Sequence, residues 1–224
     1  MLHPSGPGPF PAVVALQGCD GISNDAIQWV QWLQTQGYVV VMPDSMAPRN
    51  LHTSCGSGLK FDAQARDGVG ALAYLRTRPD VIHDKIAVLG WSSHGGAATL
   101  ISSSARFIDA SHFGGGGYKA AIACYPACAA FQDGPIATPL LVLLGGADDW
   151  QPPARCVERG AALQSAGAPV EFKVYPGATH AFDAPGRART RNVPNIRPVH
   201  LAYDPAAAAD AHSQVQRFLK AHVQ

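Results

Sequence analysis

The sequence lacks an excess of charge of either sign. Its 17 Lys and Arg residues nearly balance its 16 Asp and Glu residues, and charged residues make up only 15% of the chain. A nucleic-acid-binding domain normally carries a basic patch or stripe. The sequence has no such patch and no tail of like charge, so we expect no nucleic-acid partner.

Long hydrophobic runs are also missing. The longest, such as Leu140–Leu144, are far shorter than the roughly 20 apolar residues of a membrane-spanning helix, so we expect no membrane partner. The opening residues Met1–Pro4 have neither the charged nor the apolar region of a secretory signal peptide. As written, the sequence predicts a cytoplasmic protein, or a periplasmic or secreted one if a leader has been removed.

Cysteine is scarce and its pattern is not that of a metal site. The chain has five cysteines, an odd number that does not suit the disulfide framework of a small secreted protein. Cys124 and Cys128 have no matching Cys or His pair near Cys156, so we expect no zinc site. The cysteines are either buried thiols or form one or two disulfides, which leaves the redox compartment open.

What the sequence does have is a regular alternation of apolar segments. Its 224 residues are 47% hydrophobic, and no linker divides them, so we expect a single domain spanning residues 1–224. Short continuous apolar runs alternate with segments of helical period, which predicts an α/β fold: a doubly wound, mostly parallel sheet with helices on both faces. The predicted strands are Ala12–Leu16, Tyr38–Met42, Ile86–Leu89, Ala120–Cys124, Leu140–Leu144 and Val170–Tyr175, and the predicted helices are Asn24–Gln36, Asp62–Arg76, Pro153–Ala166 and Pro205–His222.

Two stretches fit neither strands nor helices. His112–Tyr118 contains four consecutive glycines, and Gly186–Val199 is rich in Arg, Asn and Pro. Neither stretch has the pattern of a phosphate-binding loop. Each is a surface loop or a flexible rim of a substrate pocket.

The segment Ile86–Ala97 predicts a nucleophile elbow, in which a buried strand turns tightly into a helix and presents a serine. Its fit to the pattern G-x-S-x-G is imperfect, because the segment holds one residue too many. Ser92 has Gly90 two residues before it but no glycine two after, whereas Ser93 has Gly95 two after it but no glycine two before. We favour Ser93 as the nucleophile, because this choice places Gly95 at the start of the helix, where a side chain would clash most severely. Alone, the segment could equally be a serine-rich helix cap.

The rest of a catalytic triad follows in the order serine, acid, histidine that this type of fold uses. Asp148 comes just after the strand Leu140–Leu144, where parallel sheets place their active sites. We favour it over its neighbour Asp149 as the acid. His180 lies on a glycine-containing loop after the strand Val170–Tyr175. A lone histidine is more often structural, but the serine and the acid upstream favour His180 as the general base.

Hydrolysis through a serine also needs an oxyanion hole. One expected donor is the backbone N–H of His94, the residue after Ser93, and the second is that of Cys19 in the loop Gln17–Gly21. Four aromatic residues either line a substrate pocket or belong to the core: Trp91, Trp150, Phe182 and Tyr125.

These segments together resemble the dienelactone hydrolase family of the α/β-hydrolase superfamily, over nearly the whole chain. The matching segments are Gln17–Gly21, Gly90–Gly96, Gly145–Trp150 and Pro176–Asp183, with Tyr38–Ser45 and Tyr203–Ala207 in support. The resemblance implies the α/β-hydrolase fold and hydrolysis of an ester or lactone without a metal or organic cofactor.

The sequence departs from the family pattern in three places. Dienelactone hydrolases proper have a cysteine nucleophile, whereas this elbow offers only serines, so a general esterase is expected. The elbow has its extra residue, and the β-hairpin that precedes the first strand in relatives is missing before Pro11. If a leader has been removed, relatives with similarly placed cysteines imply export and two disulfides, Cys19–Cys55 and Cys128–Cys156.

The sequence therefore predicts a serine hydrolase that cleaves small carboxylic esters or lactones through a Ser-Asp-His triad and an acyl-enzyme. A second possible enzyme has the same fold but hydrolyses another acyl bond or a C–C bond. A non-catalytic binding protein is the alternative of a different class. The distance from the elbow hydroxyls to His180 discriminates between an enzyme and a binding protein.

Overall fold

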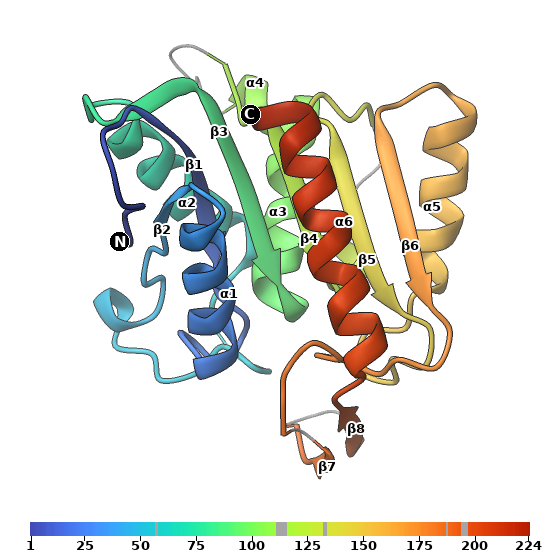
Figure 1. Cartoon of the computed structure of the whole chain (residues 1–224). Coiled ribbons are helices and arrows are strands. Elements are labelled where there is room, and N and C mark those ends of the chain that lie inside the picture. Colours follow the sequence, from blue (N-terminus) through green and yellow to red (C-terminus); the bar gives the residue numbers. More distant parts are fainter. Residues whose placement is uncertain (57, 111–115, 132–133, 187, 194–196) are drawn as a thin grey trace.

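The computed structural model describes residues 1–56, 58–110, 116–131, 134–186, 188–193 and 197–224. Its centre is a six-stranded sheet in the order β2-β1-β3-β4-β5-β6, in which every neighbouring pair is parallel (Figure 1). The strands are β1 (Phe10–Leu16), β2 (Val39–Val41), β3 (Val81–Trp91), β4 (Ala120–Cys124), β5 (Leu140–Gly145) and β6 (Val170–Tyr175). All six match predicted strands, with β3 longer than expected at both ends.

Helices cover both faces of this sheet, as the continuous apolar runs predict. The helices are α1 (Asn24–Thr35), α2 (Phe61–Leu75), α3 (Ala97–Ser102), α4 (Ala105–Ala110), α5 (Ala154–Ser165) and α6 (Pro205–Val223). Helices α1 and α6 pack on one face, and α2, α3 and α5 pack on the other (Figure 1). Alternate residues of β1 enter the two cores, Val13 on the α1 side and Val14 on the α2 side, and neither is exposed to solvent. The sheet is therefore doubly wound.

Local signals explain where the two helices of one face begin. The hydroxyl of Ser23 accepts a hydrogen bond from the N–H of Ala26 and caps α1. Asp204 caps α6 by accepting from the N–H groups of Ala206 and Ala207, and Pro205 occupies the first helical position. Both caps satisfy N–H groups that have no partner inside the helix.

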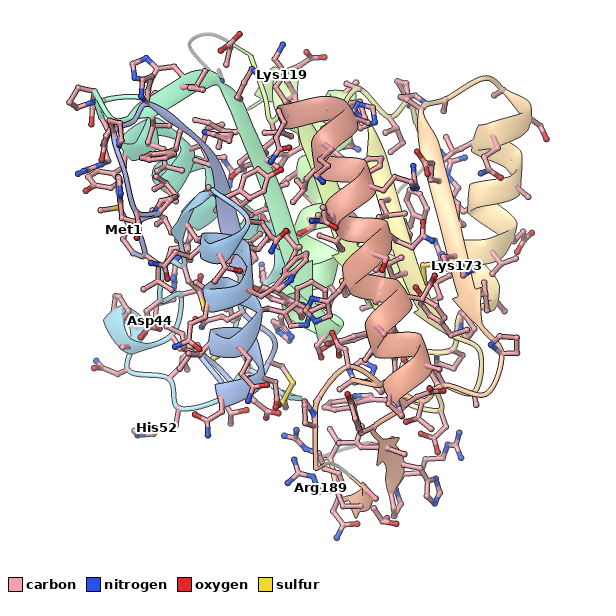
Figure 2. All side chains as sticks on the ribbon, viewed as in Figure 1. Met1, Asp44, His52, Lys119, Lys173 and Arg189 are labelled. Atoms are coloured by element: carbon pink, nitrogen blue, oxygen red, sulfur yellow. A yellow bond between two sulfur atoms is a disulfide. The ribbon has the colours of Figure 1, made fainter. Side chains whose placement is uncertain are left out.

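The two irregular stretches have different positions. Gly116–Tyr118 leads into β4 and thus lies at the amino ends of the strands, where Figure 2 labels Lys119, away from the carboxyl ends. This part of the glycine-rich stretch is not a rim of the site described below, and residues 111–115 lie outside the described residues. Within the second stretch, β7 (Ala188–Arg191) pairs in antiparallel fashion with β8 (Val199–Ala202). The hairpin lies beyond the carboxyl ends of the sheet, where Figure 2 labels Arg189.

Two disulfides join parts of the chain that are distant in sequence. They are Cys19–Cys55 and Cys128–Cys156, the pairs that the family resemblance implies. Cys124 is a free thiol at the end of β4, where burial raises its pKa well above the usual value, with a further contribution from Asp183. Within the described ranges, no helix is long and apolar enough to cross a membrane.

Two glycines of α2 provide a matched test of this packing. Gly70 is exposed, and a Cβ there would meet no atom within 4 Å, whereas a Cβ on buried Gly68 would lie 3.0 Å from the Tyr118 hydroxyl. We expect Gly70→Ala to stabilise the protein by about 0.5–1 kcal/mol through helix propensity. Gly68→Ala should lose part or all of that gain to crowding. Urea unfolding of both variants checks this, and an equal gain at the two positions would contradict the described packing of α2 on Tyr118.

Candidate active site

Ser92 and His180 are in hydrogen-bonding contact at the carboxyl ends of the strands. Ser92 begins the turn after β3, and His180 follows β6. The Ser92 Oγ lies 2.8 Å from His180 Nε2, and His180 Nδ1 lies 2.7 Å from Asp148 Oδ2. Since a carboxylate only accepts hydrogen bonds, Nδ1 carries the proton, and Nε2 accepts the proton of the Ser92 hydroxyl. The three side chains form a continuous hydrogen-bonded chain.

The backbone at Ser92 has the strained conformation of an elbow. Its φ is 64°, in the left-handed region that few residues other than glycine adopt. The turn can form because glycines allow unusually close backbone contacts. A Cβ at Gly90 would lie 2.1 Å from the Gly95 carbonyl oxygen, and a Cβ at Gly95 would lie 2.1 Å from the Leu16 carbonyl oxygen. No side chain fits at either position without a shift of the backbone.

The extra residue of the elbow is accommodated by a wider helical turn. Residues Ser92–Gly96 form a π-helical turn, η2, before α3 begins at Ala97. A π-turn closes its hydrogen bond over one residue more than an α-turn does. The insertion therefore leaves Gly90 and Ser92 in the first half of the motif and moves the second glycine one position along, to Gly95. This is the physical reason why the sequence does not fit G-x-S-x-G.

The sequence favours Ser93 over Ser92 as the nucleophile, but in this structure Ser92 is the serine that faces His180. The Ser93 Oγ lies 3.2 Å from His94 Nδ1, and His94 Nε2 donates to the Leu59 carbonyl at 3.1 Å. Ser93 is thus directed into a buried contact with His94, whose pKa is lowered by burial, partly offset by the bond to Leu59. The π-turn decides this outcome, because it rotates the second serine away from the loop of His180.

Because Ser92 rather than Ser93 faces His180, one predicted donor of the oxyanion hole changes. The residue after Ser92 is Ser93, so the N–H that follows the candidate nucleophile belongs to Ser93 and no longer to His94. Cys19 lines the same cavity as Ser92 and His180, and it remains the predicted second donor. Next to it, Gly18 lies so close to the elbow that a Cβ there would be 3.1 Å from the Ser92 Cβ.

Asp148 and its neighbour Asp149 have different partners. The second oxygen of Asp148, Oδ1, accepts from the backbone N–H groups of Trp150 at 2.9 Å and Gln151 at 2.7 Å, and the carboxylate is buried with His180. Asp149 instead accepts from the backbone N–H of His200 at 3.0 Å, and its Oδ2 lies 2.7 Å from His200 Nδ1. Burial raises the pKa of Asp149, but the bonds to His200 outweigh it and the pKa is lowered. Asp148, the acid that the sequence favours, is thus the one that contacts His180.

Strand β8 connects the loops that carry the acid and the histidine. His180 bridges to Leu201, and the Thr179 hydroxyl accepts from the N–H of Ala202 at 2.8 Å. On the same strand, His200 makes the bonds to Asp149 described above. The loops after β5 and β6 are thereby tied to one short strand, which fixes the separation of Asp148 from His180.

Aromatic rings surround the imidazole and line a small cavity. The Trp150 ring centroid lies 4.6 Å from that of His180, and the Tyr125 centroid lies 4.9 Å away in an edge-on arrangement. Both residues and Trp91 line the cavity, as predicted. Phe182 does not: its side chain is fully buried and packs on Tyr125 and Tyr175 in the core. Its ring lies behind Tyr125, so the pocket prediction for Phe182 is wrong.

Sequence reasoning missed several residues of this cavity, among them Trp29 and Arg191. Arg191, from β7, forms an ion pair with Asp20, and its guanidinium lies 5.0 Å from the Trp150 ring centroid. Its position agrees with the predicted rim in Gly186–Val199. Trp29 lies on α1, and apart from its position on an amphipathic helix nothing in the sequence indicated that it lines a cavity.

Cys19, Asp20 and Cys55 are the one group of potential metal ligands that cluster within the described part of the chain. Two of the three are joined in a disulfide. Disulfide sulfurs are not the thiolates that metal ions bind, so the group in this state does not fit a metal ion.

Comparisons with known proteins agree with this fold. The model of the dienelactone hydrolase family matches residues 1–223. Comparison of the sequence with curated proteins finds no match.

Solved structures similar to this chain include several hydrolases. A putative dienelactone hydrolase from Klebsiella pneumoniae has a TM-score of 0.70 at 18% identity, covering 96% of this chain and 89% of that one. A dienelactone hydrolase-like promiscuous phosphotriesterase from metagenomic libraries has a TM-score of 0.70 at 17% identity, with coverages of 98% and 89%. A propionate-bound esterase from Thermogutta terrifontis has a TM-score of 0.71 at 17% identity, with coverages of 98% and 87%.

At these identities the structural likeness establishes the fold alone, the α/β-hydrolase fold. The family match spans nearly the whole chain and goes further. The protein therefore belongs to the dienelactone hydrolase family and is an esterase-type hydrolase of the α/β-hydrolase fold.

Proposed function

We propose that this enzyme hydrolyses small carboxylic esters or lactones, with Ser92 as nucleophile, His180 as general base and Asp148 as the acid that orients it. The observation that carries the proposal is the 2.8 Å contact between the Ser92 hydroxyl and His180 Nε2. This distance lies within the range that proton transfer to a general base requires. It favours an enzyme over a non-catalytic binding protein.

In the first half of the reaction, the Ser92 oxygen attacks the ester carbonyl carbon while His180 Nε2 takes the hydroxyl proton. The carbonyl oxygen becomes an oxyanion, which the backbone N–H groups of Ser93 and Cys19 would stabilise. The intermediate collapses when the bond to the leaving alcohol breaks. His180 gives its proton to that alcohol, and an acyl group remains on Ser92.

In the second half, a water molecule attacks the acyl carbon and His180 takes its proton. The bond to the Ser92 oxygen then breaks, His180 returns the proton to the serine, and a carboxylic acid leaves. Throughout, Asp148 accepts the hydrogen bond from His180 Nδ1–H and stabilises the imidazolium. The two bonds from backbone N–H groups to its other oxygen hold the carboxylate in this orientation.

The two serines and the two aspartates offer matched variants that test the triad. We expect a fluorophosphonate probe to label Ser92, as located by tandem mass spectrometry, and Ser92→Ala to lower kcat on p-nitrophenyl acetate by at least about 10⁴-fold. Asp148→Asn should lower kcat by about 10⁴-fold because it leaves the wrong histidine tautomer.

Ser93→Ala and Asp149→Asn are the controls. Both should keep fluorophosphonate labelling and most of the activity, because neither side chain contacts His180 and the amide of Asp149→Asn can still accept from the His200 N–H. An adduct on Ser93, or full activity in Ser92→Ala, would contradict the assignment. A well-folded protein with no adduct and no ester hydrolysis would contradict the proposed function as a whole.

The two disulfides test the role of the Cys19 loop. They close chain segments of similar length, 36 and 28 residues apart, so replacing either pair by serines should cost a similar 2–4 kcal/mol, roughly, in the free energy of unfolding. Only Cys19→Ser/Cys55→Ser loosens the loop that would supply an oxyanion donor. We expect it to lower kcat, by up to about 10²-fold, with little change in KM.

Cys128→Ser/Cys156→Ser should keep the wild-type kcat at a temperature where both variants are folded. Denaturant unfolding and steady-state kinetics on the purified variants measure the two effects separately. Equal losses of kcat in both variants would remove Cys19 from the proposed oxyanion hole.

A further inference from the structure

Two cavities share one wall beside the candidate active site. The first has a volume of about 50 Å³ and is the one that Ser92 and His180 line. The second has a volume of about 250 Å³ and lies between α1 and α6, where Tyr203 and His212 are among its lining residues. Trp29 lines both cavities, together with Asp25 one helical turn before it. Trp29 therefore lies at the boundary between the site and a larger space.

Trp29 is held in place on three sides. Its Nε1–H donates to Asp183 Oδ2 at 2.8 Å. One face of the indole stacks on the His212 ring, with centroids 3.8 Å apart and planes 4° from parallel, and Trp32 packs edge-on at 5.3 Å. Only 3% of the residue is exposed. The hydrogen bond and the two ring contacts oppose movement of the indole out of this position.

The carboxylate of Asp183 bonds both to Trp29 and to a second residue of the site, Tyr125. Its Oδ1 accepts from the Tyr125 hydroxyl at 2.7 Å, and Tyr125 packs on His180. Burial raises the pKa of Asp183, and the bonds from Tyr125 and Trp29 act in the other direction. Moving the indole aside would remove one of the two side-chain donors to a buried carboxylate, which is costly. Asp183 thus opposes any opening of the Trp29 wall.

From this arrangement we propose that Trp29 sets the upper size of the substrate, because it closes the catalytic cavity off from the second cavity between α1 and α6. The inference deepens the proposed ester hydrolysis and rests on it. The substrates it selects are esters with short acyl and alcohol parts. Without the indole, the two cavities would merge and longer chains could extend along α1.

The test compares kcat/KM across p-nitrophenyl acetate, butyrate and octanoate, and across a matching series of alkyl acetates. The wild type should prefer the short members of both series. In Trp29→Ala, the ratio of long to short substrates should rise at least about tenfold in one series, since each methylene that a pocket admits or rejects is worth about tenfold or more. The reaction rates are measured on folded protein.

Trp32→Ala is the matched control. Trp32 lies on the same helix and contacts both Trp29 and His212, but among the described residues it is not one that lines either cavity. Its substrate profile should stay as in the wild type. An equal change in both variants would indicate general loosening of α1 and would overturn the inference.

Loss of the Trp29 N–H bond could unfold the single variant, so a second variant removes the buried charge as well. Trp29→Ala/Asp183→Asn lacks the indole but leaves an amide that can still bond to Tyr125. It should show the same shift toward long substrates. Asp183→Asn alone should keep the short-chain profile, because the amide oxygen can still accept from the Trp29 N–H and the indole stays in place. Shifts of equal size in the double variant and in Asp183→Asn would assign the effect to the carboxylate and contradict a role for indole size.

Different results would overturn the size limit and the proposed ester hydrolysis. A wild type that cleaves octanoate as fast as acetate, or folded Trp29 variants with an unchanged profile, would overturn the size limit while ester hydrolysis stands. Absence of any hydrolysis or fluorophosphonate adduct in the wild type would remove the proposed function itself.

Discussion

The site depends on one strained turn, in which the backbone of Ser92 adopts a φ of 64°. Such a conformation costs about 1–3 kcal/mol and persists only where the surroundings leave no alternative. Here the end of β3, the start of the helix and the end of β1 approach so closely that Gly90 and Gly95 meet neighbouring carbonyl groups. The buried sheet holds these segments together. The same close approach places the Ser92 side chain above the strand ends, toward His180.

The remaining residues of the site reach Ser92 because of the order of the strands. In the order β3-β4-β5-β6, the loops that follow these strands lie side by side at one edge of the sheet. They bring together Ser92, Tyr125, Asp148 and His180, although 88 residues separate the serine from the histidine. Strand β8 ties the last two loops to each other. The relative positions of Ser92, Asp148 and His180 thus depend on the central sheet and on one short strand outside it.

Much of the fold could be predicted because its determinants are local. Continuous apolar runs identified every strand of the central sheet, and caps such as Ser23 and Asp204 lie at helix starts. Asp148 and His180 were predictable because each follows a buried strand, where parallel sheets gather polar side chains. The register of the elbow was not predictable. Choosing between Ser92 and Ser93 requires knowing that the extra residue enters a π-helical turn, and no local propensity specifies that turn.

By itself, the sequence determined the alternation of strands and helices, the places of Asp148 and His180 after buried strands, and the family, because these depend on neighbouring residues and on short motifs. Only the tertiary structure decided which serine faces His180, that Phe182 belongs to the core, and that Trp29 and Arg191 reach the cavity. Those outcomes depend on contacts between residues far apart in the chain, such as Trp29 with Asp183, 154 positions later. Such contacts follow from the packing of whole elements, and no pattern within one segment contains them.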